Sequence, residues 1–384
     1  MSITRIIIMI FVFLSVFGGG TYYIARRLYK WMCLLFPNLN SRHAVVIYTG
    51  IFIFLALSVI LGFLRLPFGI RWIMHSISSY WIGIFMYLVI LFVIADIFII
   101  PLKITNILQG SLLTSVRLYS GLAVVILTTG LVCCGIINAN FIKTVNYEIQ
   151  LNDVSLNNLK IVLISDTHLG DTNSEKNLEK IVKAINDQNA DIVCIAGDIF
   201  LDDYNIIRNP ERAKNLFRSI KSTYGVYACL GNHDGGNTLN QMMAFLEESN
   251  IKLLKDEYVI IDDRFALFGR LDPHPIGGTG ELKRSDISAA ISSVGENFAV
   301  IVMDHNPANI KEYGQSVDLI LSGHTHKGQM FPGSLFTNAM FTAAYGHYQK
   351  DSSSPHVIVT SGSSTWRPPI RIGSNNEIAV IVVR

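Results

Sequence analysis

The sequence predicts an α/β domain with mixed or parallel sheets, preceded by a helical transmembrane region. Half of the 384 residues are hydrophobic and only 16% are charged, which is too apolar for a soluble enzyme or a disordered chain. Residues 1–143 carry ten Lys or Arg and a single acidic residue, whereas residues 144–384 carry 21 Lys or Arg and 28 Asp or Glu. Short β-branched runs alternate with helix-like segments in the second part, as in layered α/β folds. We therefore expect about four transmembrane helices within 1–143 and a separate domain over 144–384.

Four long stretches of the first part contain no charged residue. Each holds 20 to 25 residues, about the length that a helix needs to cross roughly 30 Å of hydrocarbon. The alternatives are buried helices of a soluble protein and, for the first stretch, a cleaved signal peptide. Four such runs in succession oppose the former, and the length of the first run opposes the latter. We expect transmembrane helices near 5–25, 44–64, 77–100 and 118–140.

The distribution of cations favours one orientation in the membrane. Four spans place both ends of the region on one side and two connecting loops on the other. The loops carry six cations, and the opposite side carries four. Because cytoplasmic loops carry more Lys and Arg, we expect an integral membrane protein of the cell membrane with its second part on the extracytoplasmic side. The six are Arg26, Arg27, Lys30, Arg42, Lys103 and Arg117, and the four are Arg5, Arg65, Arg71 and Lys143.

One acidic residue, Asp96, lies within the third apolar stretch. Acids at membrane depth are costly and mark functional sites by default. Asp96 also lies close in sequence to Lys103, so a side chain that reaches the membrane interface is an equal alternative.

The second part alternates apolar strands with helices. We expect helices at 174–188, 209–222 and 239–249. We expect strands at 160–165, 191–196, 225–230, 257–261, 265–269, 298–303, 317–322, 356–360 and 377–383. Polar residues follow five of these strands, in the segments SDTHLG, AGDIF, LGNHDGG, MDHNP and SGHTHKGQ. Since open α/β sheets bind ligands at the carboxyl ends of strands, we expect these polar side chains to meet at one edge: Asp166, His168, Asp198, Asn232, His233, Asp234, His305, His324 and His326.

Mixed oxygen and nitrogen donors suit borderline divalent ions such as Mn²⁺, Fe²⁺ or Zn²⁺. No thiol joins the group, which disfavours a structural zinc site. The donors are too many for one ion, but they fit two divalent ions about 3.5–4 Å apart with one shared carboxylate. Each motif alone is a weak signal, because Asp-x-His is usually a turn or cap and Asn-His-Asp can form an Asx-turn. The GHTH segment is stronger, since alternating residues of an extended backbone point the same way, so that His324 and His326 could reach neighbouring ions.

The series Asp-x-His, Gly-Asp, Gly-Asn-His-Asp, His and Gly-His-x-His resembles the calcineurin-like metallophosphoesterase superfamily, over roughly 150–384. The segment GSSTWRPPIRIGSNNEI at 362–378 is similar to the membrane-anchored bacterial phosphodiesterase branch, which is related to the UDP-2,3-diacylglucosamine hydrolases. The resemblance implies a four-layer αββα sandwich. Lys327 departs from that branch, where a second Gly commonly follows GHTH, and this leaves the local loop and its substrate contacts open.

The resemblance also implies roles for the motif residues. His233 would stand near the scissile phosphate, oriented by Asp234. The first ion would be bound by Asp166, His168 and His326, and the second by Asn232, His305 and His324, with Asp198 bridging both.

These expectations together predict a membrane-bound dimetal phosphoesterase, a phosphodiesterase or pyrophosphohydrolase. A water between two divalent cations is hydroxide near neutral pH and can attack phosphorus, while His233 as imidazolium can protonate the leaving alkoxide. Lys327, Arg367 and Arg371 are candidates for binding the distal part of an anionic substrate, with ordinary surface charge as the alternative.

The expected partners are the lipid bilayer and a phosphoester. Membrane tethering raises the effective concentration of a lipid-linked substrate, which makes such a substrate the specific hypothesis. The net charge of about −7 in the second part disfavours a nucleic-acid partner. The alternative function is a membrane transporter or sensor with a non-catalytic phosphoesterase-like regulatory domain.

Overall fold

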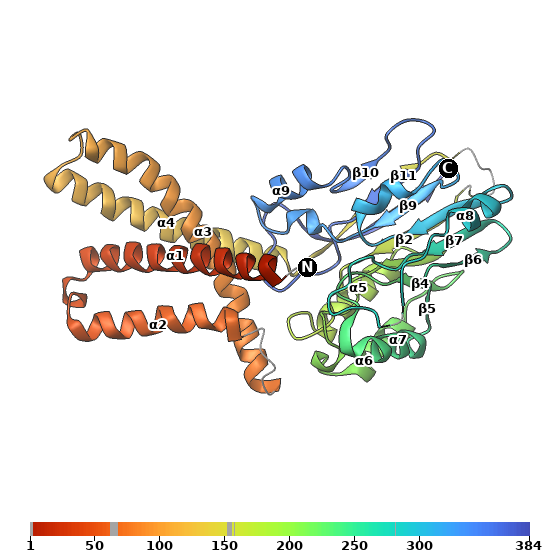
Figure 1. Ribbon diagram of the computed structural model, residues 1–384, viewed down its shortest axis with the longest axis horizontal. Helices are drawn as coiled ribbons and strands as arrows, with labels where there is room; N and C mark the ends of the chain where they lie inside the picture. The colour runs from red at the N-terminus through yellow and green to blue at the C-terminus, as the bar shows by residue number, and fades with distance from the viewer. Residues whose placement is uncertain (1–2, 62–67, 152–155, 157, 281) are drawn as a thin grey trace. The chain divides into compact units, whose positions relative to one another are not determined.

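The computed structural model describes residues 3–61, 68–151, 156, 158–280 and 282–384 (Figure 1). The chain forms two compact units, Met1–Cys134 and Gly135–Arg384. The first is helical, and the second contains the strands.

Four long helices build the first unit within the residues that are described, and the last four residues of α4 belong to the second unit: α1 (Ile3–Leu35), α2 (Arg42–Leu61), α3 (Phe68–Ile104) and α4 (Gly110–Asn138). Three of these described helices, α2, α3 and α4, are long and apolar enough to cross a membrane. Several side chains of the predicted span at 5–25 are not among those that the structure describes. Residues 62–64 of the second predicted span also lie outside the described residues. Counted over the described residues, three helices are membrane-capable, and α1 forms a helix over the whole of the predicted first span.

The acidic residue of the first unit is paired with a cation. Asp96 of α3 lies 2.6 Å from an Nη atom of Arg27 on α1, and the hydroxyl of Tyr23 donates to the other carboxylate oxygen at 2.6 Å. Both charged side chains are at least four-fifths buried. A buried carboxylate is tolerated when it is paired and hydrogen-bonded in this way.

Two six-stranded sheets form the centre of the second unit, counted over the described residues. In order across the first sheet lie β1 (Ile142–Ile149), β12 (Asn376–Val383), β2 (Lys160–Ile164), β3 (Ile192–Ala196), β4 (Val226–Cys229) and β5 (Ile251–Leu253). Across the second lie β10 (Gly346–Tyr348), β11 (His356–Val359), β9 (Leu319–Ser322), β8 (Ala299–Met303), β7 (Phe265–Gly269) and β6 (Glu257–Ile261). Strands β2 to β5 are parallel, and so are β7 to β9.

The two sheets pack face to face with helices outside them. The inner layer contains fully buried apolar residues of both sheets, including Leu163, Cys194, Ile301 and Leu319. Helices α5 (Glu175–Asn186), α6 (Pro210–Arg218) and α7 (Leu239–Glu248) cover the outer face of the first sheet (Figure 1). Helix α8 (Ser288–Gly295) and the 3₁₀ segment Pro307–Glu312 pack on the second. The predicted α/β fold is confirmed, with the layer order helix, sheet, sheet, helix.

Periodicity explains why these segments take these forms. Helix α5 buries Leu178, Ile181, Val182 and Ile185, the three- and four-residue spacing of a helix with one apolar face. Strand β3 is buried at every position, as expected for a parallel strand covered on both faces.

Among the α-helices and strands of the described residues, those that the sequence did not predict are β1, β5, β10, α8 and α9 (Gly333–Met340). Strands β5 and β10 have three residues each and take their form from their neighbours. Strand β1 alternates half-buried and exposed residues from Val145 to Glu148, and it pairs with β12 more than 200 residues away. The short strands β5 and β10 depend on tertiary contacts more than on local pattern, whereas β1 has the alternation of a strand in its own sequence from Val145 to Ile149.

Candidate metal centre

The polar motifs converge where parallel strands of both sheets end. Asp166 and His168 follow β2, Asp198 follows β3, and Asn232 follows β4 in the first sheet. In the second sheet, His305 follows β8, and His324 and His326 follow β9. Neighbouring parallel strands end at the same edge, and this brings motifs from distant parts of the sequence together.

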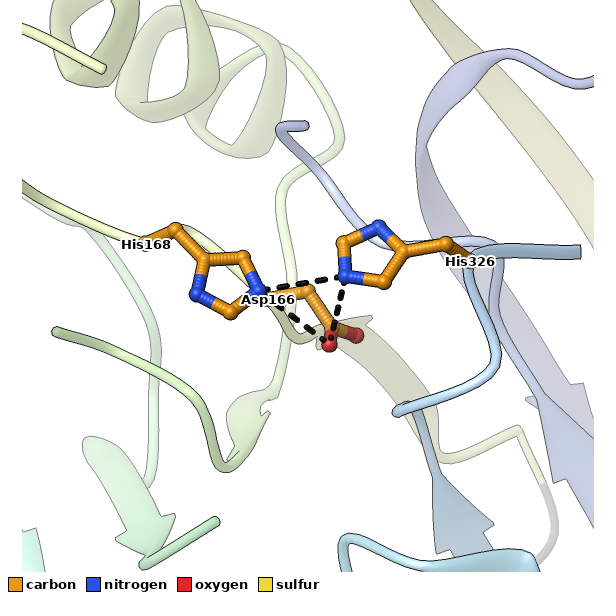
Figure 2. A group of neighbouring side chains, drawn as sticks. All are labelled: Asp166, His168 and His326. Atoms are coloured by element: carbon orange, nitrogen blue, oxygen red, sulfur yellow. Dashed lines mark hydrogen bonds and ion pairs between the residues drawn. The ribbon is translucent and has the colours of Figure 1, made fainter. Parts of the chain in front are cut away.

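Asp166, His168 and His326 form one cluster of donor atoms (Figure 2). The Nε2 atoms of the two histidines lie 3.1 Å apart. A carboxylate oxygen of Asp166, Oδ1, lies 3.3 Å from Nε2 of His326 and 3.8 Å from Nε2 of His168. Figure 2 shows both rings turned with these nitrogens toward the carboxylate. All three residues are buried.

A second cluster contains Asp198, His305 and His324, joined by Asn232. Nε2 of His305 lies 3.2 Å from Oδ2 of Asp198 and 3.1 Å from Oδ1 of Asn232. The same amide oxygen lies 2.8 Å from Nδ1 of His324. The second cluster thus presents one carboxylate, one amide oxygen and two imidazole nitrogens.

Asp198 lies between the two clusters. Its Oδ2 is 3.2 Å from His305 in the second cluster and 3.7 Å from Nε2 of His168 in the first. Its Oδ1 accepts a hydrogen bond from the backbone N–H of His233 at 2.8 Å. One carboxylate oxygen within reach of both groups is the arrangement required of a shared ligand.

The donor chemistry fits a pair of divalent cations. Nδ1 of His305 donates to the carbonyl of Ala196 at 2.8 Å, so its Nε2 is the atom that faces the oxygens of Asn232 and Asp198. Within the described residues, Oδ1 of Asp166 is buried and receives no hydrogen bond. Acceptor atoms that converge without donors between them are unfavourable unless a cation or proton lies among them.

The histidines of the two clusters differ in how readily they are protonated. Burial, more than its charged neighbours, lowers the pKa of His168 to about 3, and burial followed by His305 lowers that of His324 to about 4. Burial opposes the charged form of His305, but Asp198 raises its pKa well above the ordinary value. Neutral imidazole is the metal-binding form, and metal binding displaces protons from such sites.

The backbone is strained at the same residues. Asp166, His168 and Asp198 have φ of +54°, +42° and +54°, and His324 and His326 have φ of +71° and +49°. Non-glycine residues rarely adopt this left-handed conformation, and such strain clusters at functional sites. The prediction of an extended GHTH backbone is wrong, because the segment turns at both histidines. This turn directs His324 to one cluster and His326 to the other.

Two glycines of the motifs provide space for the carboxylates. A Cβ on Gly231 would overlap the carboxylate of Asp198. A Cβ on Gly323 would lie 2.5 Å from Oδ2 of Asp166. Larger side chains at these positions would displace the carboxylates, so the glycines belong to the construction of the site.

His233 lies beside the clusters but is held by a different acid from the predicted one. Its Nε2 is 4.0 Å from Oδ2 of Asp198, and its ring contacts Trp366 at 5.8 Å between centroids. Its Nδ1 bonds to a carboxylate oxygen of Asp202 at 2.5 Å. Burial lowers the pKa of His233, but Asp202 and Asp198 outweigh it and raise the pKa above its ordinary value.

The predicted role of Asp234 in orienting His233 is wrong. Its fully buried carboxylate accepts from the backbone N–H groups of Ile199, Phe200 and Gly231 at 3.1, 2.8 and 2.9 Å. Burial and the charge of Asp198 raise its pKa to about 7. Asp234 therefore ties the loop after β3 to the loop after β4. Asp202 has the orienting position, and its only signal in the sequence is that it follows the Gly-Asp motif by four residues.

The three predicted substrate cations have different surroundings. Nζ of Lys327 lies 4.0 Å from the ring centroid of Tyr345, and an Nη atom of Arg367 lies 3.0 Å from Asp202. Arg371 is only 1% exposed and donates to backbone carbonyls of His326, Ser361 and Ser364. The structure thus opposes the predicted substrate contact of Arg371, whose guanidinium fixes the loops around His326. Lys327 and Arg367 stay predicted substrate contacts.

Comparisons with known proteins agree with this geometry. The family model for calcineurin-like phosphoesterases matches residues 159–328. An uncharacterized metallophosphoesterase of Campylobacter jejuni is 30% identical over 278 residues, which are 69% of this chain and 70% of that protein. An uncharacterized metallophosphoesterase of Helicobacter pylori is 31% identical over 58% of this chain and 59% of its own. A transmembrane protein with metallophosphoesterase domain from Danio rerio is 32% identical over 67% of this chain and 61% of its own. The matches thus span about 60% of the last two relatives.

Proposed function

We propose that this chain, which belongs to the calcineurin-like metallophosphoesterase family, is a metal-dependent hydrolase of a phosphodiester or a pyrophosphate. The observation that supports this most directly is the pair of donor clusters that share Oδ2 of Asp198. The residues that would hold the first ion are Asp166, His168 and His326, and those for the second are Asn232, His305 and His324.

When bound, two divalent ions would supply Lewis-acid chemistry, namely neutralisation of phosphoryl charge and activation of a water nucleophile. The protein must hold the donors in place and move protons. Asp198 is fixed by the backbone N–H of His233, and His305 by the carbonyl of Ala196. The loops around His326 are fixed by Arg371.

His233 is the proposed general acid. The carboxylates of Asp202 and Asp198 favour its charged form, so that the imidazolium has a proton to give to the leaving oxygen. Its Nε2 is directed toward the centre, 4.0 Å from Asp198, while its Nδ1 is anchored by Asp202. Asp202 is a positioning residue in this proposal.

The proposal is tested with the purified full chain. Metal analysis by inductively coupled plasma spectrometry should find close to two divalent ions per chain, and the Mn²⁺-loaded protein should hydrolyse bis-p-nitrophenyl phosphate. Activity on monoesters alone would contradict the diesterase assignment. Absence of bound metal after gentle purification would instead favour the regulatory-domain alternative.

We also propose that the enzyme is membrane-bound, with the metal centre on the extracytoplasmic side. Three apolar helices in the described part of the chain and relatives described as transmembrane proteins support the membrane assignment. The proposed extracytoplasmic side of the metal centre rests on the excess of cations in the two loops of the first unit. Protease added to intact cells should cleave the second unit; cleavage only after lysis would place it in the cytoplasm.

A further inference from the structure

Helix α9 and its flanks carry an exposed apolar surface. Among the described residues, α9 buries none of its own side chains. The sequence from 328 to 349 contains no Lys, Arg, Asp or Glu. We call the following five residues the α9 surface, with their exposed fractions: Phe331 (52%), Leu335 (59%), Phe336 (66%), Met340 (76%) and Trp366 (42%). An apolar group this exposed on a water-facing domain marks a surface for interaction.

The α9 surface adjoins the candidate metal centre. The Trp366 ring contacts His233. Phe341, which follows α9 directly, lies 5.8 Å from the ring of His324 between centroids. The hydroxyl of Thr325, between the two GHTH histidines, donates to the carbonyl of Ala344 at 2.7 Å. Whatever contacts the α9 surface is therefore close to the candidate metal centre.

The base of the α9 surface is tied to the end of α4 within the second unit. The backbone N–H of Phe331 donates to the carbonyl of Ile372 at 2.7 Å. The adjacent Arg371 donates its backbone N–H to the carbonyl of Gly135 at 3.0 Å. The side-chain amide of Asn138, the last residue of α4, donates to the carbonyls of Arg371 and Ser374. Residues 371–374 thus bridge the last turn of α4 and the start of the α9 segment.

Helix α4 has the length and composition of a membrane span. Its 29 residues extend about 43 Å at 1.5 Å per residue, against roughly 30 Å of hydrocarbon. The last turn of an inserted α4 would therefore lie in the head-group region. Because residues 371–374 hold the α9 segment to this turn, the α9 surface would meet the same region. Exposed aromatic and aliphatic side chains, with Trp among them, are typical of protein surfaces that lie in a membrane interface.

We propose that the α9 surface docks onto the lipid bilayer that holds α4 and keeps the metal centre at the level of the head groups. The occupant is the bilayer itself. The inference rests on the membrane assignment made above but not on the proposed chemistry. Two cations lie next to the α9 surface in sequence: Lys327 directly precedes the uncharged segment 328–349, and Arg367 directly follows Trp366. Their positive charges suit anionic head groups.

Depth measurement by spin labelling tests this directly on the full chain. Cys33, Cys133 and Cys134 are replaced by Ala, while the buried Cys194 and Cys229 are kept. A nitroxide is attached to F336C or, in a second variant, to L335C. The matched control is Y258C on β6, where an exposed aromatic residue (44%) lies outside the α9 surface.

Each protein is reconstituted in nanodiscs of phosphatidylcholine and phosphatidylglycerol, and co-elution with lipid confirms insertion. We expect labels at 335 and 336 to collide at least several-fold more with oxygen than with a water-soluble nickel chelate, relative to the label at 258. If the label at 336 collides with the nickel chelate as often as the label at 258 does, the surface faces water and the proposal is overturned. Low collision with both reagents would overturn it too, because protein would cover the surface. Neither collision measurement requires catalysis. An inactive enzyme whose labels at 335 and 336 lie in lipid would therefore refute only the proposed function.

Discussion

Nδ1 of His233 lies 2.5 Å from a carboxylate oxygen of Asp202, while the acid next to His233 in the sequence, Asp234, turns away to three backbone N–H groups. The two acids therefore have separate tasks. Asp202 sets the orientation and charge of His233, and Asp234 joins the loops that carry Asp198 and Asn232. This division decides which substitution should change proton transfer.

Asp202→Asn should lower kcat by about 10- to 100-fold, a part of the roughly 10²- to 10⁴-fold that a positioned general acid contributes. Asp202 raises the pKa of His233, so its loss should lower that pKa. A general acid must be protonated, and activity falls as pH rises through its pKa. The alkaline limb of the pH profile of kcat/KM should therefore move to lower pH. The control is Asp351→Asn, an exposed loop carboxylate; a reduced rate with an unmoved limb would contradict the role of Asp202.

Asp198→Ala should remove more metal than the loss of a ligand from one cluster. Since Asp198 faces both clusters, we expect fewer than about one ion per chain in this variant. His326→Ala should retain about one, because the second cluster stays complete. Metal analysis after dialysis measures both, with His347→Ala, at an exposed histidine outside the clusters, as the control. Equal metal content in the Asp198 and His326 variants would argue against a shared carboxylate.

Gly231→Ala should destabilise the folded protein and displace the Asp198 carboxylate, because it adds a methyl group where there is no space for one. The added Cβ would overlap the Asp198 carboxylate and its backbone nitrogen, and overpacking typically costs about 1–3 kcal/mol. We expect a lower Tm together with weaker metal retention, measured by thermal melting and metal analysis on the same sample. Gly314→Ala, where a Cβ meets nothing within 4 Å, should leave both unchanged. An unchanged metal content in Gly231→Ala would show that the carboxylate can move without loss of binding.

Arg371→Leu should act on stability. Removal of the guanidinium leaves the buried carbonyls of His326, Ser361 and Ser364 without these donors, at about 1–3 kcal/mol each. A loss of about 3 kcal/mol or more would lower Tm by about 6–12 °C. Arg384→Leu, at a mostly exposed arginine, provides the comparison. A raised KM with normal Tm would restore the substrate contact that the sequence predicted for Arg371.

The donor set could be predicted because each motif follows an apolar run that is recognisable by itself. Asp166, Asp198 and His305 directly follow strands that are buried at nearly every position. The partner of His233 could not be predicted, because Asp202 reaches it from a left-handed turn (φ +62°) that no local pattern specifies. Arg371 resembles a surface cation in sequence, and only the loops folded around it make its burial tolerable. Strand β1, in contrast, could have been predicted, because apolar and polar residues alternate from Val145 to Ile149.

Strand β12 lies inside the first sheet, parallel to β1 on one side and antiparallel to β2 on the other. During synthesis the segments 142–149 and 160–164 leave the ribosome long before 376–383 exist. Until then one edge of β2 has no pairing partner, and the loop with Asp166 and His168 follows a strand of an incomplete sheet. Assembly of the metal centre must therefore wait for translation to reach the final strand, which exposes the nascent domain to edge-to-edge pairing with other chains.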